Sequence, residues 1–190
     1  MKTTLISTLA LSVLGLSSQL AMASDGTVTV NGAVNGNTCI INGGSASFAV
    51  TLPSVSTNEL ASAGQTAGRT PFNIKLTSCP WAFGNIHTFF EAGPTTDATT
   101  GRLILAGGGA SNVQIGLQNA DKTDIKAGFA DALQNSKSAQ LTGYIEPVPG
   151  EGVNRYVGEV TLRYFAQYYA TGVATAGVAN SSVMYTIAYD

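Results

Sequence analysis

The chain of 190 residues contains a single histidine, His87, and most hydrolytic chemistry open to the sequence would depend on it. A Ser/His/Asp arrangement needs an imidazole that acts as general base. His87 lies within the run 86–90, IHTFF, which is typical of a strand, so we interpret it as an ordinary strand histidine. The chain also lacks GxSxG, HExxH and GxxxxGK[ST] motifs. We predict no catalytic residue of this kind.

Paired carboxylates could instead support glycoside hydrolysis. Glu146 and Glu151 flank a Pro-Gly turn, and Asp121 and Asp124 lie in a polar loop. Because Asp and Glu are mostly solvent-exposed in folded proteins, we interpret all four as solvated turn acids. A secreted hydrolase that uses an Asp/Glu pair is a minor alternative, and the prediction is that the protein is not an enzyme.

The two cysteines, Cys39 and Cys79, lie 40 positions apart. Zinc needs more ligands than these two cysteines and one histidine supply, so neither a metal nor a cofactor site is predicted. In an exported chain two cysteines favour one disulfide, which would stabilise the fold by roughly 3 to 4 kcal/mol on the chain-entropy model.

Aromatic side chains suggest one further kind of site. Trp81 follows Cys79-Pro80 and could stack on a sugar, with Tyr144 or Tyr156 nearby. A self-contained secreted carbohydrate-binding module is therefore the main alternative function. Such a module would fold unaided as a monomer.

Composition limits the class of protein. Nine basic residues against eleven acidic ones give a net charge of -2, which does not favour nucleic acid as a partner. Only 11% of residues are charged and 44% are hydrophobic, so the chain is expected to fold. Its 22 glycines suit short strands joined by turns, and we predict a single all-β domain.

The first 23 residues have the features of a signal peptide. Lys2 supplies the positive charge, residues 5–16 are mostly apolar, and 21–23 read Ala-Met-Ala before the expected cleavage. The apolar run is shorter than the roughly 20 residues of a membrane span, and no other stretch approaches that length. We predict an exported protein without a membrane span.

Strict alternation of apolar residues predicts six or seven strands, separated by glycine-rich and proline-rich turns as in an antiparallel sandwich. One face of each predicted strand carries Val28, Val30, Gly32 and Val34; Phe48, Val50 and Leu52; Phe72, Ile74 and Leu76; Val113, Ile115 and Leu117; Val160, Leu162 and Tyr164; or Val183, Tyr185, Ile187 and Tyr189. The segment 124–133 fits a short helix, a loop or a strand pair equally well.

Alternating strands lie near both ends of the mature chain, and an exposed apolar strand invites pairing with a second chain. An ordered set of motifs accompanies them: VxVxGxV at 28–34, Cys39 and Cys79, YATG at 169–172, Gly177 as the fourteenth residue from the end, and a penultimate Tyr189. With these motifs the chain resembles fimbrial subunits of the chaperone/usher pathway, of the type 1 and P fimbria kind.

The resemblance implies an incomplete immunoglobulin-like sandwich that lacks its last strand and is completed by a donor strand from a chaperone or a neighbouring subunit. It implies a groove beside Gly177, Val183, Tyr185, Ile187 and Tyr189, and a donor strand carrying Val28, Val30, Gly32 and Val34. The domains would be a signal peptide at 1–23, an N-terminal extension at 24–36 and a pilin domain at 37–190.

The implied function is that of a structural subunit that polymerises head to tail and so supports cell adhesion. Its partners would be neighbouring pilin subunits, a periplasmic chaperone and an outer-membrane usher, and its location an extracellular fimbrium reached through the periplasm. An adhesin would need a second, receptor-binding domain, so a rod-forming or linking subunit is expected. Alternation alone also allows 28–34 to be the first strand of a complete sandwich.

Overall fold

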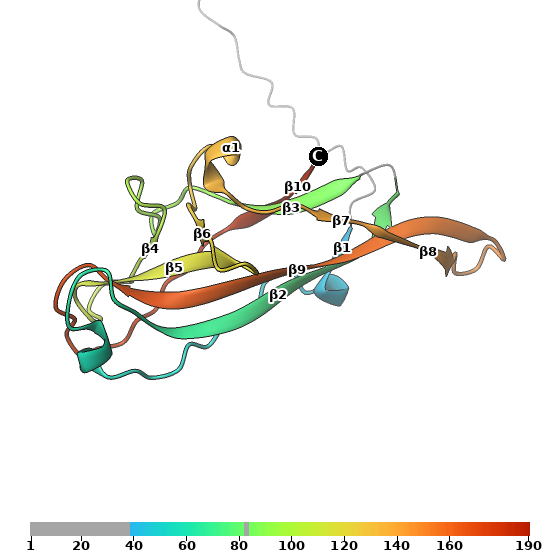
Figure 1. Ribbon diagram of the computed structural model, residues 1–190. Helices are drawn as coiled ribbons and strands as arrows, with labels where there is room; N and C mark the ends of the chain where they lie inside the picture. Colours follow the sequence, from blue (N-terminus) through green and yellow to red (C-terminus); the bar gives the residue numbers. More distant parts are fainter. Residues whose placement is uncertain (1–38, 82–83) are drawn as a thin grey trace, which may run out of the picture. The chain divides into compact units, whose positions relative to one another are not determined.

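The computed structural model describes residues 39–81 and 84–190 (Figure 1). Two β-sheets lie face to face in this part of the chain. The larger sheet has the order β1-β2-β9-β5-β4, with β6 paired to β5 and β8 paired to β9, and the smaller has the order β10-β3-β7. All these pairings are antiparallel, which makes the described chain an antiparallel β-sandwich.

The strands of the described residues are β1 (Ile40–Ile41), β2 (Thr66–Pro80), β3 (Asn85–Phe90), β4 (Leu103–Ile104), β5 (Val113–Asn119), β6 (Asp124–Ile125), β7 (Ala139–Gln140), β8 (Thr142–Pro147), β9 (Asn154–Ala170) and β10 (Tyr185–Tyr189). Short helical turns are η1 (Asn42–Gly44), η2 (Thr57–Leu60) and α1 (Asp131–Gln134). The long strands β2 and β9 pair along most of their length and form the centre of the larger sheet.

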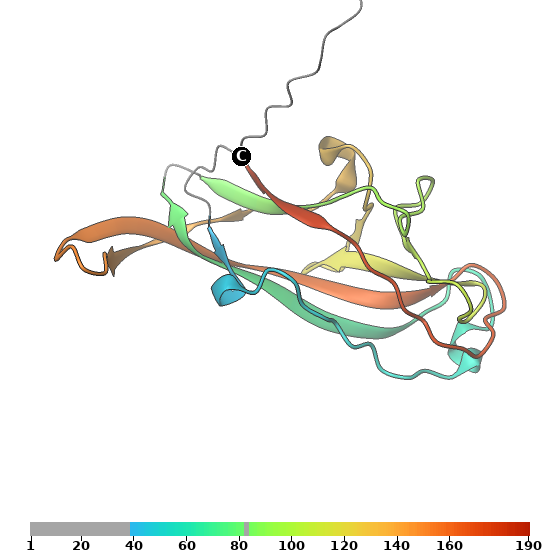
Figure 2. The same ribbon diagram turned by 180° about the vertical axis from the view of Figure 1, so that it is seen from behind.

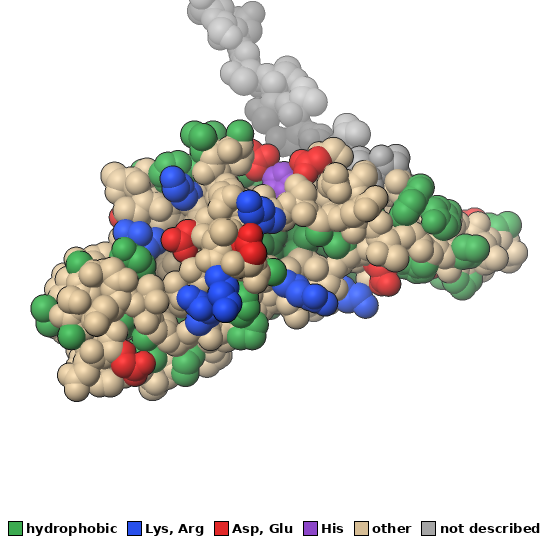
Figure 3. All heavy atoms as spheres, viewed as in Figure 1, with side chains coloured by type: hydrophobic (Ala, Val, Ile, Leu, Met, Phe, Trp, Pro, Cys, Tyr) green, Lys and Arg blue, Asp and Glu red, His purple; other side chains and the backbone are tan. Residues whose placement is uncertain are grey.

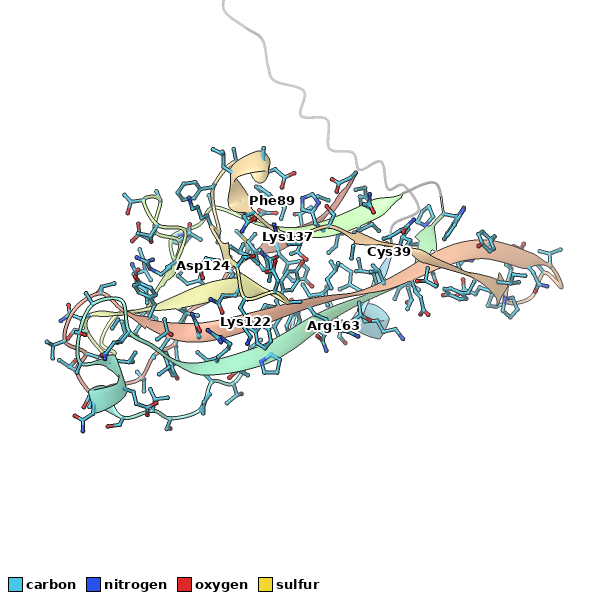
Figure 4. All side chains as sticks on the ribbon, in the orientation of Figure 1. Cys39, Phe89, Lys122, Asp124, Lys137 and Arg163 are labelled. Carbon is cyan, nitrogen blue, oxygen red and sulfur yellow. A yellow bond between two sulfur atoms is a disulfide. The ribbon has the colours of Figure 1, made fainter. Side chains whose placement is uncertain are left out.

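Alternating apolar side chains fill the space between the sheets. The core includes Ile74 and Leu76 of β2, Leu117 of β5, Leu162 and Tyr164 of β9, Ile86 and Phe90 of β3, and Ile187 of β10. Outward-facing positions of the same strands, such as Lys75 and Arg163, are exposed. Figure 4 shows Arg163 projecting away from the space between the sheets. The predicted alternation over 72–76, 113–117 and 160–164 is therefore confirmed.

The predicted disulfide is present between Cys39, which precedes β1, and Cys79 in β2. A bulge between Leu76 and Cys79 interrupts the pairing of β2 with β9. Ser78 adopts a left-handed conformation there, with φ of 53°. Cys79 is completely buried, so the disulfide joins the start of the described chain to the core.

The segment 124–133, whose conformation the sequence left open, contains both short elements. Asp124–Ile125 pair with β5 as β6, and the four-residue α1 begins at Asp131. Gln134 at the end of α1 is fully buried. Its side-chain amide donates to the Phe90 carbonyl at 2.8 Å and accepts from the Phe90 N–H at 2.7 Å. A glutamine side chain thus pairs with β3 as a strand backbone would.

Two strand predictions differ from the structure. Residues 48–52 pair with no strand among the described residues, and Val183 precedes β10 instead of lying in it. The described residues contain ten strands, and β1, β4, β6 and β7 among them were not expected because they have only two residues each. Such pieces are too short to show alternation.

Candidate strand-binding groove

A long groove lies along one side of the sandwich. Its two walls are the segments 46–57 and 174–185, here named the N-wall and the C-wall, which lie outside the strands except for Tyr185 at the start of β10. Figure 2 shows the two walls as loops that run beside the larger sheet. The groove encloses about 1250 Å³, which exceeds the usual volume of a small-molecule site.

Core side chains form the floor of the groove. They come from both sheets and include Phe72, Ile74, Phe90, Leu103, Ile115, Leu117 and Tyr168. Phe48 of the N-wall remains 42% exposed although its ring lies 6.1 Å from that of Phe72. Burial in this apolar region raises the pKa of the Tyr168 and Tyr185 phenols above the usual value. The groove is therefore an opening into the hydrophobic core.

Most of the N-wall backbone has no hydrogen-bond partner among the described residues. Within the described chain, no backbone N–H or C=O group of residues 47–55 takes part in a hydrogen bond. Folded proteins pair nearly all such groups or leave them to water. The N-wall is an extended segment with an apolar face. Its unpaired backbone groups resemble those of an edge strand that lacks its neighbour.

Over residues 176–184 the C-wall has backbone partners on one edge only within the described chain. The carbonyls of Val178, Asn180 and Met184 accept hydrogen bonds from Ala110, Ala106 and Glu91, at 2.7 to 2.9 Å. The backbone groups of the alternate residues 177, 179, 181 and 183 have no partner in the described part of the chain. In an extended segment these groups point to the opposite edge.

β10 continues the C-wall with the same asymmetry. It pairs with β3 on one edge, and no described strand pairs with its other edge. The groove therefore presents two rows of unpaired backbone groups above an apolar floor. A β-strand matches such a site, because its side chains would cover the floor while its backbone pairs with both walls.

Glycine residues allow two backbone segments to lie close together at one end of the C-wall. A Cβ atom on Gly177 would lie 2.5 Å from the Ala110 nitrogen and 2.8 Å from the Gly109 carbonyl carbon. Gly109 is equally crowded, since a Cβ there would lie 2.1 Å from the Val178 carbonyl oxygen. The two backbones are joined by the hydrogen bond from Ala110 N–H to Val178. These two glycines set the position of the C-wall.

The residues predicted for the groove have different locations. Gly177, Val183 and Tyr185 line it, whereas Ile187 and Tyr189 lie farther along β10 and pack in the adjoining core. The predicted donor residues Val28, Val30, Gly32 and Val34, the extension 24–36 and the signal peptide 1–23 lie outside the described residues.

The sequence analysis missed the N-wall as part of the site. Its alternation at Phe48, Val50 and Leu52 was a signal for an extended segment with one apolar face, and that face does line the groove. The pattern carries no information about whether a strand has a partner.

His87 is buried between two carboxylates. Its Nε2 lies 2.8 Å from Asp131 of α1, and its Nδ1 lies 3.3 Å from Asp190 at the end of the chain. The Ser138 hydroxyl donates to Asp190 at 2.5 Å and lies 3.5 Å from the imidazole. The ring therefore connects β3, α1 and the C-terminal residue, which fits a structural histidine on a strand.

The four acids considered for hydrolysis lie in or beside turns. Glu146 is less solvated than expected: it accepts from the Ser78 hydroxyl at 2.7 Å and from Arg155 Nε at 2.7 Å. These contacts lower the pKa of Glu146, with the Ser78 hydrogen bond as the largest cause. Asp121 accepts from the hydroxyl and N–H of Thr123, which lowers its pKa.

The aromatic residues considered for a sugar site divide between two faces of the β8–β9 hairpin. Trp81 and Tyr156 pack edge to face with ring centroids 4.8 Å apart. The Tyr144 hydroxyl instead accepts from the Ser78 N–H at 3.2 Å. Among residues 39–81 and 84–190, no helix is long and apolar enough to span a membrane, and no cluster of three acidic, histidine or cysteine side chains could hold a metal ion.

Comparison with known proteins decides between a self-contained module and a subunit with an open groove. The family model "Type-1 fimbrial protein, A" matches residues 52–190. The chain belongs to the type-1 fimbrial protein family. It is 46% identical to the F17 fimbrial protein of Escherichia coli over 179 residues, covering 91% of this chain and 92% of that protein.

A second relative is the major fimbrial subunit SMF-1 of Stenotrophomonas maltophilia. It is 44% identical over 175 residues, covering 90% of the fimbrial subunit described here and 95% of the relative. The protein is therefore a structural subunit of a cell-surface fimbrium, and the comparisons give no support to the carbohydrate-binding module.

Solved structures agree on the fold. A subunit of a chaperone-usher pilus superposes with a TM-score of 0.59 at 21% identity, covering 88% of this chain and 96% of that one. The P pilus rod subunit PapA superposes with a TM-score of 0.57 at 18% identity, covering 80% and 99%. The fimbrial subunit thus has the immunoglobulin-like fold of these pilins.

Proposed function

We propose that the groove of this fimbrial subunit receives a β-strand from another protein and that this exchange builds the filament. The observation that carries the proposal is the pair of walls with unpaired backbone groups on both sides of an apolar floor. A single inserted strand would supply the missing hydrogen bonds and cover the exposed core. Each fully buried valine would add about 1.5 to 3 kcal/mol.

The donor in the filament is the N-terminal extension of a neighbouring subunit, residues 24–36, after removal of the signal peptide 1–23. Val28, Val30 and Val34 enter the groove, and Gly32 passes a point too narrow for a side chain. The domain that receives them is 37–190. Because the donor and the groove are different surfaces of one chain, the contact repeats without closing and yields a filament.

Before assembly, the groove is filled by a strand of a periplasmic chaperone, which an outer-membrane usher exchanges for the extension. An open apolar groove on an exported subunit supports this step, since an unfilled groove would cause aggregation. The subunit has a structural role in adhesion and acts without catalysis.

Substitution of Gly32 in the full chain tests the proposal. Gly32→Trp is expected to prevent insertion, so subunits should accumulate as monomers bound to the chaperone. Ala33→Trp, on the other face of the same segment, is the matched control and should assemble. The measurement is the amount of polymer that can be sheared from the cell surface. Normal assembly of Gly32→Trp would refute the role of the extension.

A further inference from the structure

The β8–β9 hairpin carries an unpartnered apolar face. Ile145 lies directly opposite Tyr156 in the antiparallel register, so both side chains point to the same face. Gly143 is two residues from Ile145 on this face, and Trp81 packs over it: a Cβ on Gly143 would lie 2.7 Å from the Trp81 ring. We name Trp81, Ile145 and Tyr156 the hairpin patch.

The hairpin patch is exposed to an unusual degree for side chains of its kind. Ile145 is 67% exposed, Tyr156 54% and Trp81 45%. In Figure 3, hydrophobic side chains gather along this hairpin, while the Lys and Arg side chains in view lie over the body of the sandwich. Large apolar side chains grouped on a surface are typical of a protein contact.

The other face of the hairpin carries an ion pair. Glu146 and Arg155 lie opposite each other in the register and form an ion pair with a shortest contact of 2.6 Å. The Ser78 hydroxyl donates to the same carboxylate, at the bulge of β2. These contacts anchor the hairpin and leave the hairpin patch facing outward.

The chain that precedes Cys39 indicates what covers the patch. The Cα atoms of Cys39 and Cys79 are 4.1 Å apart, and Trp81 follows Cys79 by two residues. The Trp81 Cα therefore lies within about 11 Å of the Cys39 Cα. The described chain therefore begins, at Cys39, at the end of the domain that carries the hairpin patch.

The short connection also limits where the receiving subunit can lie. Val34 and Cys39 are five positions apart, a span of at most about 18 Å. A neighbour that holds Val34 in its groove must therefore approach the end of the domain at which Cys39 and Trp81 lie. The patch would then be continuous with the strand contact.

We propose that the hairpin patch packs against the copy of the chain that receives the N-terminal extension, so that each junction of the filament has a second, apolar contact beside the inserted strand. This inference rests on the proposed function. The second contact would fix the angle between successive subunits, which the short connection alone leaves free.

Photocrosslinking in assembled fimbriae tests the proposal. The full chain carries p-benzoylphenylalanine at Ala33 and at Tyr156, and is expressed as a small fraction among unlabelled copies. If both probes reach the same neighbour, irradiation gives dimers joined at two points. Ile145 is the second position for the probe if the Tyr156 variant does not assemble.

The outcomes separate the two proposals. Trimers, or dimers joined through position 33 alone, would overturn the hairpin contact and leave strand exchange intact. Position 33 faces away from the groove floor, so its probe should reach the N-wall or C-wall of another copy, and absence of that crosslink would overturn strand exchange itself. A chain labelled at Ala33 and at the exposed Asn58 of η2 is the control and should give no doubly joined dimers.

Discussion

The Tyr185 hydroxyl donates a hydrogen bond to the Ala46 carbonyl at 2.5 Å and so joins the two walls of the groove. Ala46 begins the N-wall, and Tyr185 ends the C-wall and begins β10. The N-wall lacks ladder hydrogen bonds over residues 47–55 within the described chain, so this contact fixes its start relative to the C-wall. The Tyr185 side chain therefore joins the walls at this end, by this hydrogen bond and by its ring contact with Phe48 at 6.3 Å between centroids.

Tyr185→Phe should loosen the N-wall without removing apolar contacts. Loss of a hydrogen bond of this kind costs about 0.5 to 1.5 kcal/mol, which corresponds to a lowering of the melting temperature by a few degrees. The measurement is the thermal dissociation of isolated fimbriae. Tyr169→Phe is the control, because its hydroxyl has no hydrogen-bond partner among the described residues, and an equal effect of both changes would contradict the account.

Gly177→Ala should displace the C-wall, because the added Cβ would meet the backbone of Gly109 and Ala110 at less than 3 Å. We expect fewer assembled subunits on the cell surface and a destabilisation of roughly 1 to 3 kcal/mol from overpacking. Gly107→Ala is the matched control, since nothing lies within 4 Å of its added Cβ. Wild-type assembly of Gly177→Ala would show that the wall position is not critical.

Removing the disulfide by Cys39→Ser together with Cys79→Ser should lower the free energy of unfolding by roughly 3 to 4 kcal/mol on the chain-entropy model. The bond spans 40 positions and links β2 to the point where the described chain begins. Chemical denaturation of fimbriae with and without the substitutions measures the difference. An unchanged denaturation midpoint would mean that the cross-link does not constrain the unfolded chain.

Acid should weaken the contact at the C-terminus. The pKa of Asp190 is lowered from its ordinary 3.8, first by the Ser138 hydrogen bond and then by the charge and hydrogen bond of His87. A carboxyl with a lowered folded-state pKa stabilises the fold above its unfolded pKa, and this stability is lost as pH falls through the folded value. Asp131 also faces His87, so both carboxylates contribute to the same contact.

The measurement is the melting temperature of wild type and Asp190→Asn as a function of pH. The wild type should be the more stable at neutral pH, and the difference should shrink as the pH falls below about 4. Glu151→Gln, in the exposed hairpin turn, should show no difference at any pH. A gap between wild type and Asp190→Asn that persists unchanged at low pH would contradict the ionic origin of the effect.

The sequence predicted the fold well where alternation is long. Phe72, Ile74 and Leu76 lie in β2 with their side chains toward the core, as expected. The hairpin strand β8 was missed, because Gly143, Pro147 and the charged Glu146 interrupt the apolar pattern. Its stability comes from pairing with β9 and from the Glu146–Arg155 ion pair, which link residues that are not adjacent in sequence.

The groove was only partly predictable. The residues of the C-wall could be named from the resemblance, but the N-wall could not, since Phe48 to Leu52 has the same pattern as a paired strand. Whether an extended segment has a neighbour depends on the rest of the fold, and alternation reports only its apolar face. Similarly, the contacts of His87 with Asp131 and Asp190 require residues 44 and 103 positions away.

The most direct measurement is a thermal melt of residues 37–190 with and without a synthetic peptide of residues 24–36. Strand insertion requires stabilisation by mass action, about 2.7 kcal/mol at a peptide concentration 100 times the Kd. We expect a clear rise in melting temperature that the Gly32→Trp peptide fails to produce. A domain that melts cooperatively at the same temperature with either peptide or with none would contradict strand exchange.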